Sequence, residues 1–202
     1  MARTRKPELE AARRTLVTDA AMRLLASGSW KSMTLAAVAV KAGVSKGVVT
    51  YWYPSKDALI VAAIDRHHER YRRALSAIVE TPGDVESLLS ALVQAILPSQ
   101  EEVANEVAFQ AEVWSYAKEH PHVRDEITAS YRWFREVSGA LLALGSEGVA
   151  APLIAPENLL RLAHALIDGL SIHVAYDPEV DLPEVRAVLL RQLRTWFELD
   201  AS

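Results

Sequence analysis

Helix-starting and helix-ending residues follow one another closely between positions 34 and 56, and they limit what this stretch can form. Thr34 and Ser45 are suited to cap the start of a helix, and Gly43 is suited to end one. Pro54 breaks the segment that Ser45 opens. Each segment between these signals therefore has room for only about two helical turns. The sequence predicts two short helices joined by a tight turn that contains glycine.

The rest of the chain also shows helical periodicity, and no segment shows convincing β alternation. In the first helix the apolar positions recur near every fourth residue: Leu9, Ala12, Leu16, Ala20 and Leu24. Breaks at His120-Pro121 and in the loop 145–156 separate the later helices. Besides the two short segments, we expect helices at residues 8–27, 56–80, 84–97, 99–119, 122–144, 157–176 and 183–199. The expected fold class is all-α, with about nine helices.

Composition excludes several classes of protein. The chain has 202 residues, half of them hydrophobic, and a mean hydropathy of +0.06, which suits a globular protein. There is no cysteine, so disulfides and thiolate metal sites are excluded. Apolar runs fall short of the roughly 20 residues that a spanning helix needs, and the charged start leads into no apolar region. We expect a cytoplasmic protein that does not enter a membrane.

The net charge of −4 hides a strong asymmetry. Residues 1–59 carry ten basic and four acidic side chains, a net charge of +6, whereas residues 60–202 carry 12 basic and 22 acidic, a net charge of −10. A basic N-terminal part on an acidic remainder suggests that only the first part meets a polyanion.

The two short helices have the composition of a helix-turn-helix, whose second helix enters the DNA major groove. Their small core is expected to contain Val38, Ala39, Val44 and Val49. The side chains expected to reach DNA are Lys46, Gly47, Thr50 and Tyr51. Glycine lowers helix propensity by about 1 kcal/mol relative to alanine, so Gly47 suggests a close approach to the backbone. An ordinary helix-helix corner is the alternative, and the positive charge favours DNA binding.

No constellation typical of an enzyme is found. His67 and His68 are adjacent and point to different sides of a helix, and His122 and Glu126 lack a convincing third ligand. No phosphate-binding loop or dinucleotide fingerprint occurs, so we expect no cofactor, no metal site and no catalytic residue. A helical protein-interaction module with a basic head is the alternative to a DNA-binding regulator.

The motifs together resemble a known family. Arg13-Arg14, AAMRLL, Gly28 and MTLAAVAVKAGVSKGVVTYWYPSKDAL resemble the N-terminal domain of the TetR family of bacterial transcriptional regulators over about 50 residues. In the remainder, FQAEVWSYAKEHPHVRDEI and HALIDGLSIHVAYDPE resemble the BetI-like branch. The resemblance implies a three-helix DNA-binding domain at residues 1–59 and an effector-binding and dimerisation domain at residues 60–202. It also implies a regulator, by default a repressor, that a small molecule releases from its operator.

The resemblance places particular residues at DNA. Thr34 and Lys56 are expected on the phosphates, Trp52 against the backbone, and Tyr53 inside the fold. Thr50 departs from the tyrosine common in the family, and its methyl or hydroxyl group can contact thymine or phosphate. The full set expected at DNA is Thr34, Ser45, Lys46, Gly47, Val48, Thr50, Tyr51, Trp52 and Lys56.

Upstream of the first helix, Arg3, Arg5 and Lys6 form a basic arm. A solvated tail and a minor-groove or phosphate contact are both open for this arm.

A single helix-turn-helix domain binds DNA weakly, so we expect a homodimer on a double-stranded, palindromic operator. In the family the last two helices form a four-helix dimer bundle, although both faces could also fill the core of one chain. The interface candidates are Leu159, Leu162, Ala163, Leu166, Ile167, Leu170, Val185, Val188, Leu189, Leu193 and Trp196.

The acidic domain is expected to hold an effector of unknown identity. Aromatic residues with an acid could enclose a cation such as a quaternary amine, but a pocket for a small apolar or amphipathic molecule is the preferred interpretation. The pocket candidates are Glu106, Phe109, Glu112, Trp114, Trp133, Phe134 and His173.

Overall fold

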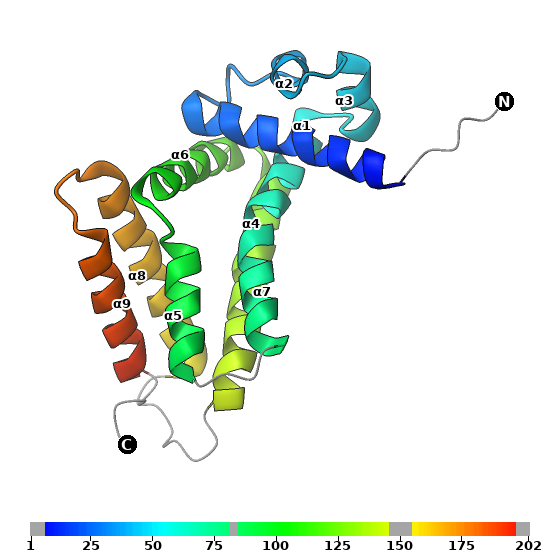
Figure 1. The fold of residues 1–202 in the computed structure, drawn as a ribbon. Helices are drawn as coiled ribbons and strands as arrows, with labels where there is room; N and C mark the ends of the chain where they lie inside the picture. The colour runs from blue at the N-terminus through cyan, green and yellow to red at the C-terminus, as the bar shows by residue number, and fades with distance from the viewer. Residues whose placement is uncertain (1–6, 81–84, 146–154, 197–202) are drawn as a thin grey trace. The chain divides into compact units, whose positions relative to one another are not determined.

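The structure is a computed structural model that describes residues 7–80, 85–145 and 155–196. Nine α-helices and no strand occur within these ranges, which confirms the expected all-α fold (Figure 1). The helices are α1 (Pro7–Ser27), α2 (Leu35–Ala42), α3 (Lys46–Trp52), α4 (Lys56–Glu80), α5 (Val85–Ile96), α6 (Gln100–Ala117), α7 (Pro121–Gly145), α8 (Pro156–Tyr176) and α9 (Leu182–Trp196).

The chain divides into two compact units. We call the described residues up to Glu69, together with Ala108–Ile127, the head unit. Arg70–Val107 and the described residues from Thr128 onward form the body unit. The helices α4, α6 and α7 each contribute residues to both units. The functional boundary expected between residues 59 and 60 stays a prediction.

The head unit has a core of small and medium apolar side chains. Helix α1 packs on α2, and α2 packs on α3. The buried side chains include Val17, Ala21, Leu25, Val38, Val49, Leu59 and Ile60 from α1 to α4, and Phe109, Val113 and Tyr116 from α6. The C-terminal half of α6 therefore completes the core beneath the short helices.

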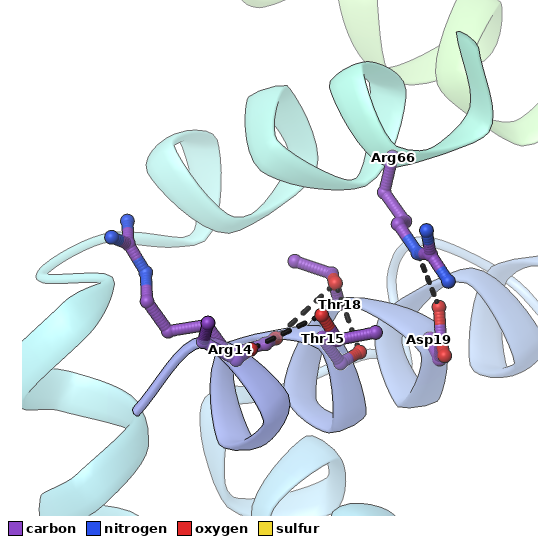
Figure 2. A network of polar contacts seen from close by, with 6 residues as sticks. Arg14, Thr15, Thr18, Asp19 and Arg66 are labelled. Atoms are coloured by element: carbon purple, nitrogen blue, oxygen red, sulfur yellow. Dashed lines mark hydrogen bonds and ion pairs between the residues drawn. The ribbon is translucent and has the colours of Figure 1, made fainter. Parts of the chain in front are cut away.

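A polar contact also joins α1 to α4 in the head unit, and a buried hydroxyl lies nearby on α1. Arg66 Nε donates a hydrogen bond to Asp19 Oδ1 at 2.9 Å (Figure 2). Thr18 is buried, and its hydroxyl donates to the carbonyl oxygens of Arg14 and Thr15, 3.2 and 3.0 Å away. This buried hydroxyl is thus satisfied by its own helix.

The body unit has a separate apolar core. Helix α9 contacts both α5 and α8, and Figure 1 shows these three helices side by side. Leu89, Val93, Leu97, Val174 and Leu189 are buried between them. At one end of α9, Arg186 donates to the carbonyl oxygens of Leu97, at 2.7 Å, and Pro98. Among the described helices, none is long and apolar enough to span a membrane.

Candidate nucleic-acid interface

The two short helices begin and end as their sequence requires. Thr34 Oγ1 accepts from the Ala37 N–H at 3.1 Å, and Ser45 Oγ accepts from the Val48 N–H at 3.3 Å. Gly43 ends α2 with φ of 66°, a left-handed conformation that favours glycine. These local hydrogen bonds fix where α3 starts and how it leaves α2.

Helix α3 has one buried face and one exposed face. Val49 is fully buried, and Val38 and Ala39 of α2 are also buried in the head core. This confirms the expected small core, in which Val44 is partly buried. The exposed side of α3 carries Lys46, Gly47, Thr50 and Tyr51, while Val48 and Trp52 are half-buried. Tyr53 is buried directly after the helix.

Gly47 occupies the first turn of α3 without being forced there by the packing of the head. Among the described residues, and apart from its chain neighbours and the backbone of α3 itself, a Cβ atom at Gly47 would meet only Ser45 Oγ, at 3.8 Å, which is an ordinary van der Waals contact. The described part of the chain therefore leaves room for a larger residue at this exposed position. A close approach of DNA to Gly47 stays a prediction.

Lys56, which was expected on the phosphates, has partners inside the head unit. Its ammonium donates to the carbonyl oxygen of Trp30 and lies 5.2 Å from the Trp30 ring and 5.5 Å from the Tyr116 ring. Burial lowers the pKa of Lys56, and the nearby carboxylate of Asp57 opposes that shift. These contacts favour a positioning role for Lys56 over a phosphate contact, and the choice between the two stays a prediction.

Trp30 lies in the loop between α1 and α2, and its backbone N–H, its carbonyl oxygen and its indole N–H each form a hydrogen bond. Its backbone N–H donates to Glu112 Oε2 at 2.6 Å, and its indole Nε1–H donates to Ser115 Oγ at 3.3 Å. The Trp30 ring also meets the Tyr116 ring edge-on, with centroids 5.0 Å apart. Three residues of α6 thereby fix the loop that precedes the helix-turn-helix.

A second set of contacts joins the start of α4 to the end of α6. The hydroxyl of Tyr116 donates to Asp57 Oδ1, and His120 Nδ1 lies 3.4 Å from the same oxygen. The rings of Tyr116 and His120 stack with centroids 3.6 Å apart. Burial and then the hydrogen bond to Asp57 raise the pKa of Tyr116. Sequence reasoning missed this cluster, because its members are far apart along the chain.

The pocket candidates fall in both units. In the head unit, Phe109 is buried against His67, Glu112 holds Trp30, and Trp114 is 37% exposed. In the body unit, Glu106 accepts from the Tyr71 hydroxyl at 2.9 Å, and Arg72 lies 5.9 Å from the Trp133 ring.

Phe134 and His173, the remaining pocket candidates, differ in their surroundings. Phe134 packs edge-on against His164, and His173 is exposed. The partners of Phe109 and Glu112 favour structural roles for these two residues. The assignment of all seven candidates to a pocket stays a prediction.

An aromatic and ionisable cluster in the body unit joins α7 to α8. His164 is contacted edge-on by Tyr131 and Phe134 of α7, both with centroids 4.8 Å away. Its Nε2 lies 3.7 Å from Asp168 Oδ1. Burial lowers the pKa of His164 and raises that of Asp168. The sequence signal for this pair is the spacing of four residues on one helix face.

The interface candidates on α8 and α9 separate into two groups. Leu159, Ala163, Leu189 and Leu193 are buried within the chain. Leu162 and Val188 are exposed, and Leu166, Ile167, Leu170, Val185 and Trp196 are half-buried. The structure adds Ile172 and Tyr176 of α8 as large exposed apolar side chains. Arg3, Arg5 and Lys6 lie outside the described residues.

Helices α1 to α3, of which α3 is capped and carries a lysine and a tyrosine on its exposed side, have the arrangement of a helix-turn-helix DNA-binding protein. Residues 17–63 match the family model described as bacterial regulatory proteins, TetR family. Residues 85–198, more than half of the chain, match the model described as BetI-type transcriptional repressor, C-terminal. The chain belongs to the TetR family of transcriptional regulators, and its C-terminal region is of the BetI type.

Curated relatives are similar in sequence over most of the chain. A helix-turn-helix-type transcriptional regulator encoded in the dhlA 5′ region of Xanthobacter autotrophicus is 28% identical over 190 residues, covering 88% of this chain and 89% of that protein. The nicotine-responsive repressor HdnoR of Paenarthrobacter nicotinovorans is 25% identical over 167 residues, covering 82% and 85%. Both relatives are named as transcriptional regulators, and both family models describe transcriptional regulators and not enzymes.

The fold is also similar to that of a solved structure. A TetR-family transcriptional regulator from Rhodococcus sp. matches with a TM-score of 0.79 at 20% identity, covering 93% of this chain and 99% of that one.

Proposed function

We propose that this regulator is a homodimeric repressor that reads a palindromic operator in the cytoplasm through α3 and leaves it when a small molecule binds the body unit. The observation that carries the proposal is the exposed row of Lys46, Gly47, Thr50 and Tyr51 on a helix whose opposite side is anchored by Val49. The basic charge of residues 1–59 attracts the DNA backbone to this part of the chain.

The roles on α3 follow from its two faces. The side chains of Lys46, Thr50 and Tyr51 reach base edges or phosphates, and Gly47 lets the DNA approach the helix backbone. Thr34 and Ser45 set the start of each short helix through their caps. Val48 and Trp52, at the margin of the exposed face, contact the DNA backbone.

Dimerisation is supported by the apolar face that α8 leaves exposed within the chain. Leu162, Ala165, Ile172 and Tyr176 share this face with Gly169. Apart from the adjacent residues and backbone of α8 itself, an added Cβ at Gly169 would meet no atom of the described residues within 4 Å. A second copy of α8 approaching closely would account for both the exposed apolar groups and the glycine. Val188 extends the face onto α9.

Effector release is supported by the BetI-type match and by a relative named as nicotine-responsive. The effector is a small apolar or amphipathic molecule held in the body unit. It favours a state in which the two reading helices are wrongly spaced, and a difference of about 1 to 3 kcal/mol in its affinity for the two states is sufficient. The candidate link between α6 and the helix-turn-helix is the set of contacts that Trp30 makes with Glu112, Ser115 and Tyr116.

Selection from random DNA duplexes tests the proposal. The fraction bound at near-physiological salt is amplified and sequenced over several rounds, with a Lys46→Ala/Tyr51→Ala variant as the matched control. We expect an inverted repeat with half-site centres about 34 to 36 Å apart, or a multiple of that spacing, from the unsubstituted protein alone. Failure to enrich any sequence, or enrichment of the same sequence by the variant, would reject reading by α3.

A second experiment tests effector control with the selected duplex. Compounds that shift the thermal unfolding midpoint are tested for release of the bound duplex. We expect at least one stabilising compound to release it, and stabilisation that never alters DNA affinity would reject effector control.

A further inference from the structure

Thr50 is the exposed residue of α3 for which the structure most limits the kinds of contact it can make with DNA. Threonine offers two different groups to DNA, a hydroxyl that forms hydrogen bonds and a methyl that makes apolar contact. Thr50 Oγ1 donates to the carbonyl oxygens of Lys46 and Gly47, 3.0 and 3.3 Å away. The hydroxyl proton is therefore held by the preceding turn of the helix.

The same arrangement occurs at Thr18 on α1, where its consequence is visible. The Thr18 hydroxyl also donates to carbonyl oxygens three and four residues earlier, and Figure 2 shows the side chain turned back onto its own helix. With its hydroxyl satisfied in this way, Thr18 is only 5% exposed. Threonine in this arrangement can serve as an apolar residue.

Thr50 differs from Thr18 in being exposed on the proposed DNA face. The two substituents on its Cβ diverge, so the methyl group is directed away from the carbonyl oxygens that hold the hydroxyl. Side chains on a helix lean over the preceding turn, and the residue three positions before Thr50 is Gly47, which has no side chain to cover the methyl. A methyl group beside bare glycine backbone forms an apolar surface open to the groove.

We propose that Thr50 is a specificity-determining residue that recognises the C5-methyl group of a thymine in each half-site through its own methyl group. This inference rests on the proposed reading of DNA by α3. In the major groove the thymine methyl is the apolar group that distinguishes an A·T pair. The hydroxyl of Thr50 makes no base contact that discrimination requires.

The test compares three proteins on two kinds of DNA by fluorescence anisotropy. The DNA is the selected operator, and the same duplex with each thymine replaced in turn by uracil, which lacks only the methyl group. The proteins are the unsubstituted regulator, Thr50→Val, which keeps a methyl and loses the hydroxyl, and Thr50→Ser, which keeps the hydroxyl and loses the methyl. Circular dichroism melting of each protein provides the control for folding.

One thymine per half-site is expected to show the effect. Replacing it with uracil in one half-site should weaken binding about fourfold, and in both half-sites about fifteenfold, as expected for removing one buried methyl group from each. Thr50→Val should bind within about twofold of the unsubstituted protein and keep the preference for thymine. Thr50→Ser should bind about fifteenfold more weakly and bind the thymine and uracil duplexes equally.

Three results would overturn the inference. They are retention of the thymine preference by Thr50→Ser, a large loss of binding by Thr50→Val, and equal binding of the thymine and uracil duplexes by the unsubstituted protein. Failure of the proposed function itself looks different, because the unsubstituted protein would then bind the selected duplex and a shuffled duplex of the same composition equally. That result rejects the reading of DNA by α3 and this inference with it.

Discussion

The backbone N–H of Trp30 donates to the carboxylate of Glu112 across 82 positions of sequence, at a distance of 2.6 Å. The carbonyl oxygen of the same residue accepts from the ammonium of Lys56. A negative and a positive side chain thus hold the two backbone polar groups of Trp30, in the loop before the helix-turn-helix. Residues of α4 and α6 therefore hold the loop that precedes the helix-turn-helix.

Replacing Glu112 with glutamine should loosen this loop. The amide oxygen can still accept from Trp30, but the hydrogen bond loses its charge-assisted strength. We expect the free energy of unfolding to fall by about 1 kcal/mol, measured by urea denaturation, and operator affinity to fall with it. Glu119→Gln, at an exposed position just after α6, is the matched control and should change neither quantity. Equal effects of the two substitutions would show that the contact with Trp30 is unimportant.

Lys56→Met separates a positioning lysine from one that binds phosphate. Methionine keeps a long apolar side chain but cannot donate to Trp30, so the thermal unfolding midpoint should fall. The slope of log affinity against log salt should stay unchanged. Lys46→Met should instead lower that slope by about one for each phosphate that the lysine neutralises. A lower salt slope for Lys56→Met, with an unchanged unfolding midpoint, would return Lys56 to the phosphates.

Gly47→Ala is expected to change stability and DNA affinity in opposite directions. Alanine favours the helix by up to about 1 kcal/mol, and its Cβ fits beside Ser45 Oγ. The same Cβ would obstruct close approach of DNA, so operator binding should weaken although the protein becomes more stable. Ser90→Ala, at an exposed position of α5, is the control for added helix propensity alone. Tighter or unchanged operator binding by Gly47→Ala would refute the close approach.

Charged groups on the exposed face of α8 should produce monomers. Leu162→Glu/Ile172→Glu introduces four carboxylates into the proposed interface of one dimer, and burying them without partners is strongly unfavourable. Sedimentation equilibrium reports the mass directly. Leu16→Glu, at an apolar side chain that is 50% exposed on α1, is the control and should remain dimeric. A dimeric Leu162→Glu/Ile172→Glu protein would place the interface elsewhere.

His164 should make the body unit less stable in mild acid. Burial lowers its pKa below the ordinary value of 6.5, although Asp168 opposes the shift and Arg135 adds to it. Below pH 6.5 the unfolded chain therefore binds more protons at this site than the native protein, and the free energy of unfolding falls with pH. His164→Gln should reduce this loss between pH 7 and pH 5.5 in urea denaturation. His173→Gln, at an exposed histidine, is the control. An identical pH dependence for the unsubstituted protein and His164→Gln would contradict the expectation.

Local signals explain which parts of the fold could be predicted from sequence. The caps at Thr34, Gly43 and Ser45 are formed by residues within a few positions of one another, and the structure confirms them. Burial depends on neighbours instead. In α1 the apolar repeat includes Leu9 and Leu16, which are 48% and 50% exposed, whereas Val17 is fully buried. Periodicity predicts the helix, but packing against the other helices decides which face is inside.

The candidate DNA-binding site also has features that the sequence predicts and features that it does not. The exposure of Lys46, Gly47, Thr50 and Tyr51 could be predicted, because one anchored face of a short helix leaves the other outside. The partners of Trp30 could not, because no local pattern marks a contact between residues so distant in sequence. An apolar helix face also looks the same whether it meets its own chain or a second copy, so buried and exposed interface candidates were indistinguishable from sequence.

Reading of a specific sequence by α3 is tested most directly by the ratio of two affinities. Fluorescence anisotropy at near-physiological salt compares the selected operator with a shuffled duplex of the same composition, for the unsubstituted protein and for Lys46→Ala/Tyr51→Ala. We predict a ratio of at least about 10³ for the unsubstituted protein and a ratio near one for the variant. A ratio near one for the unsubstituted protein, or an undiminished ratio for the variant, would contradict the account.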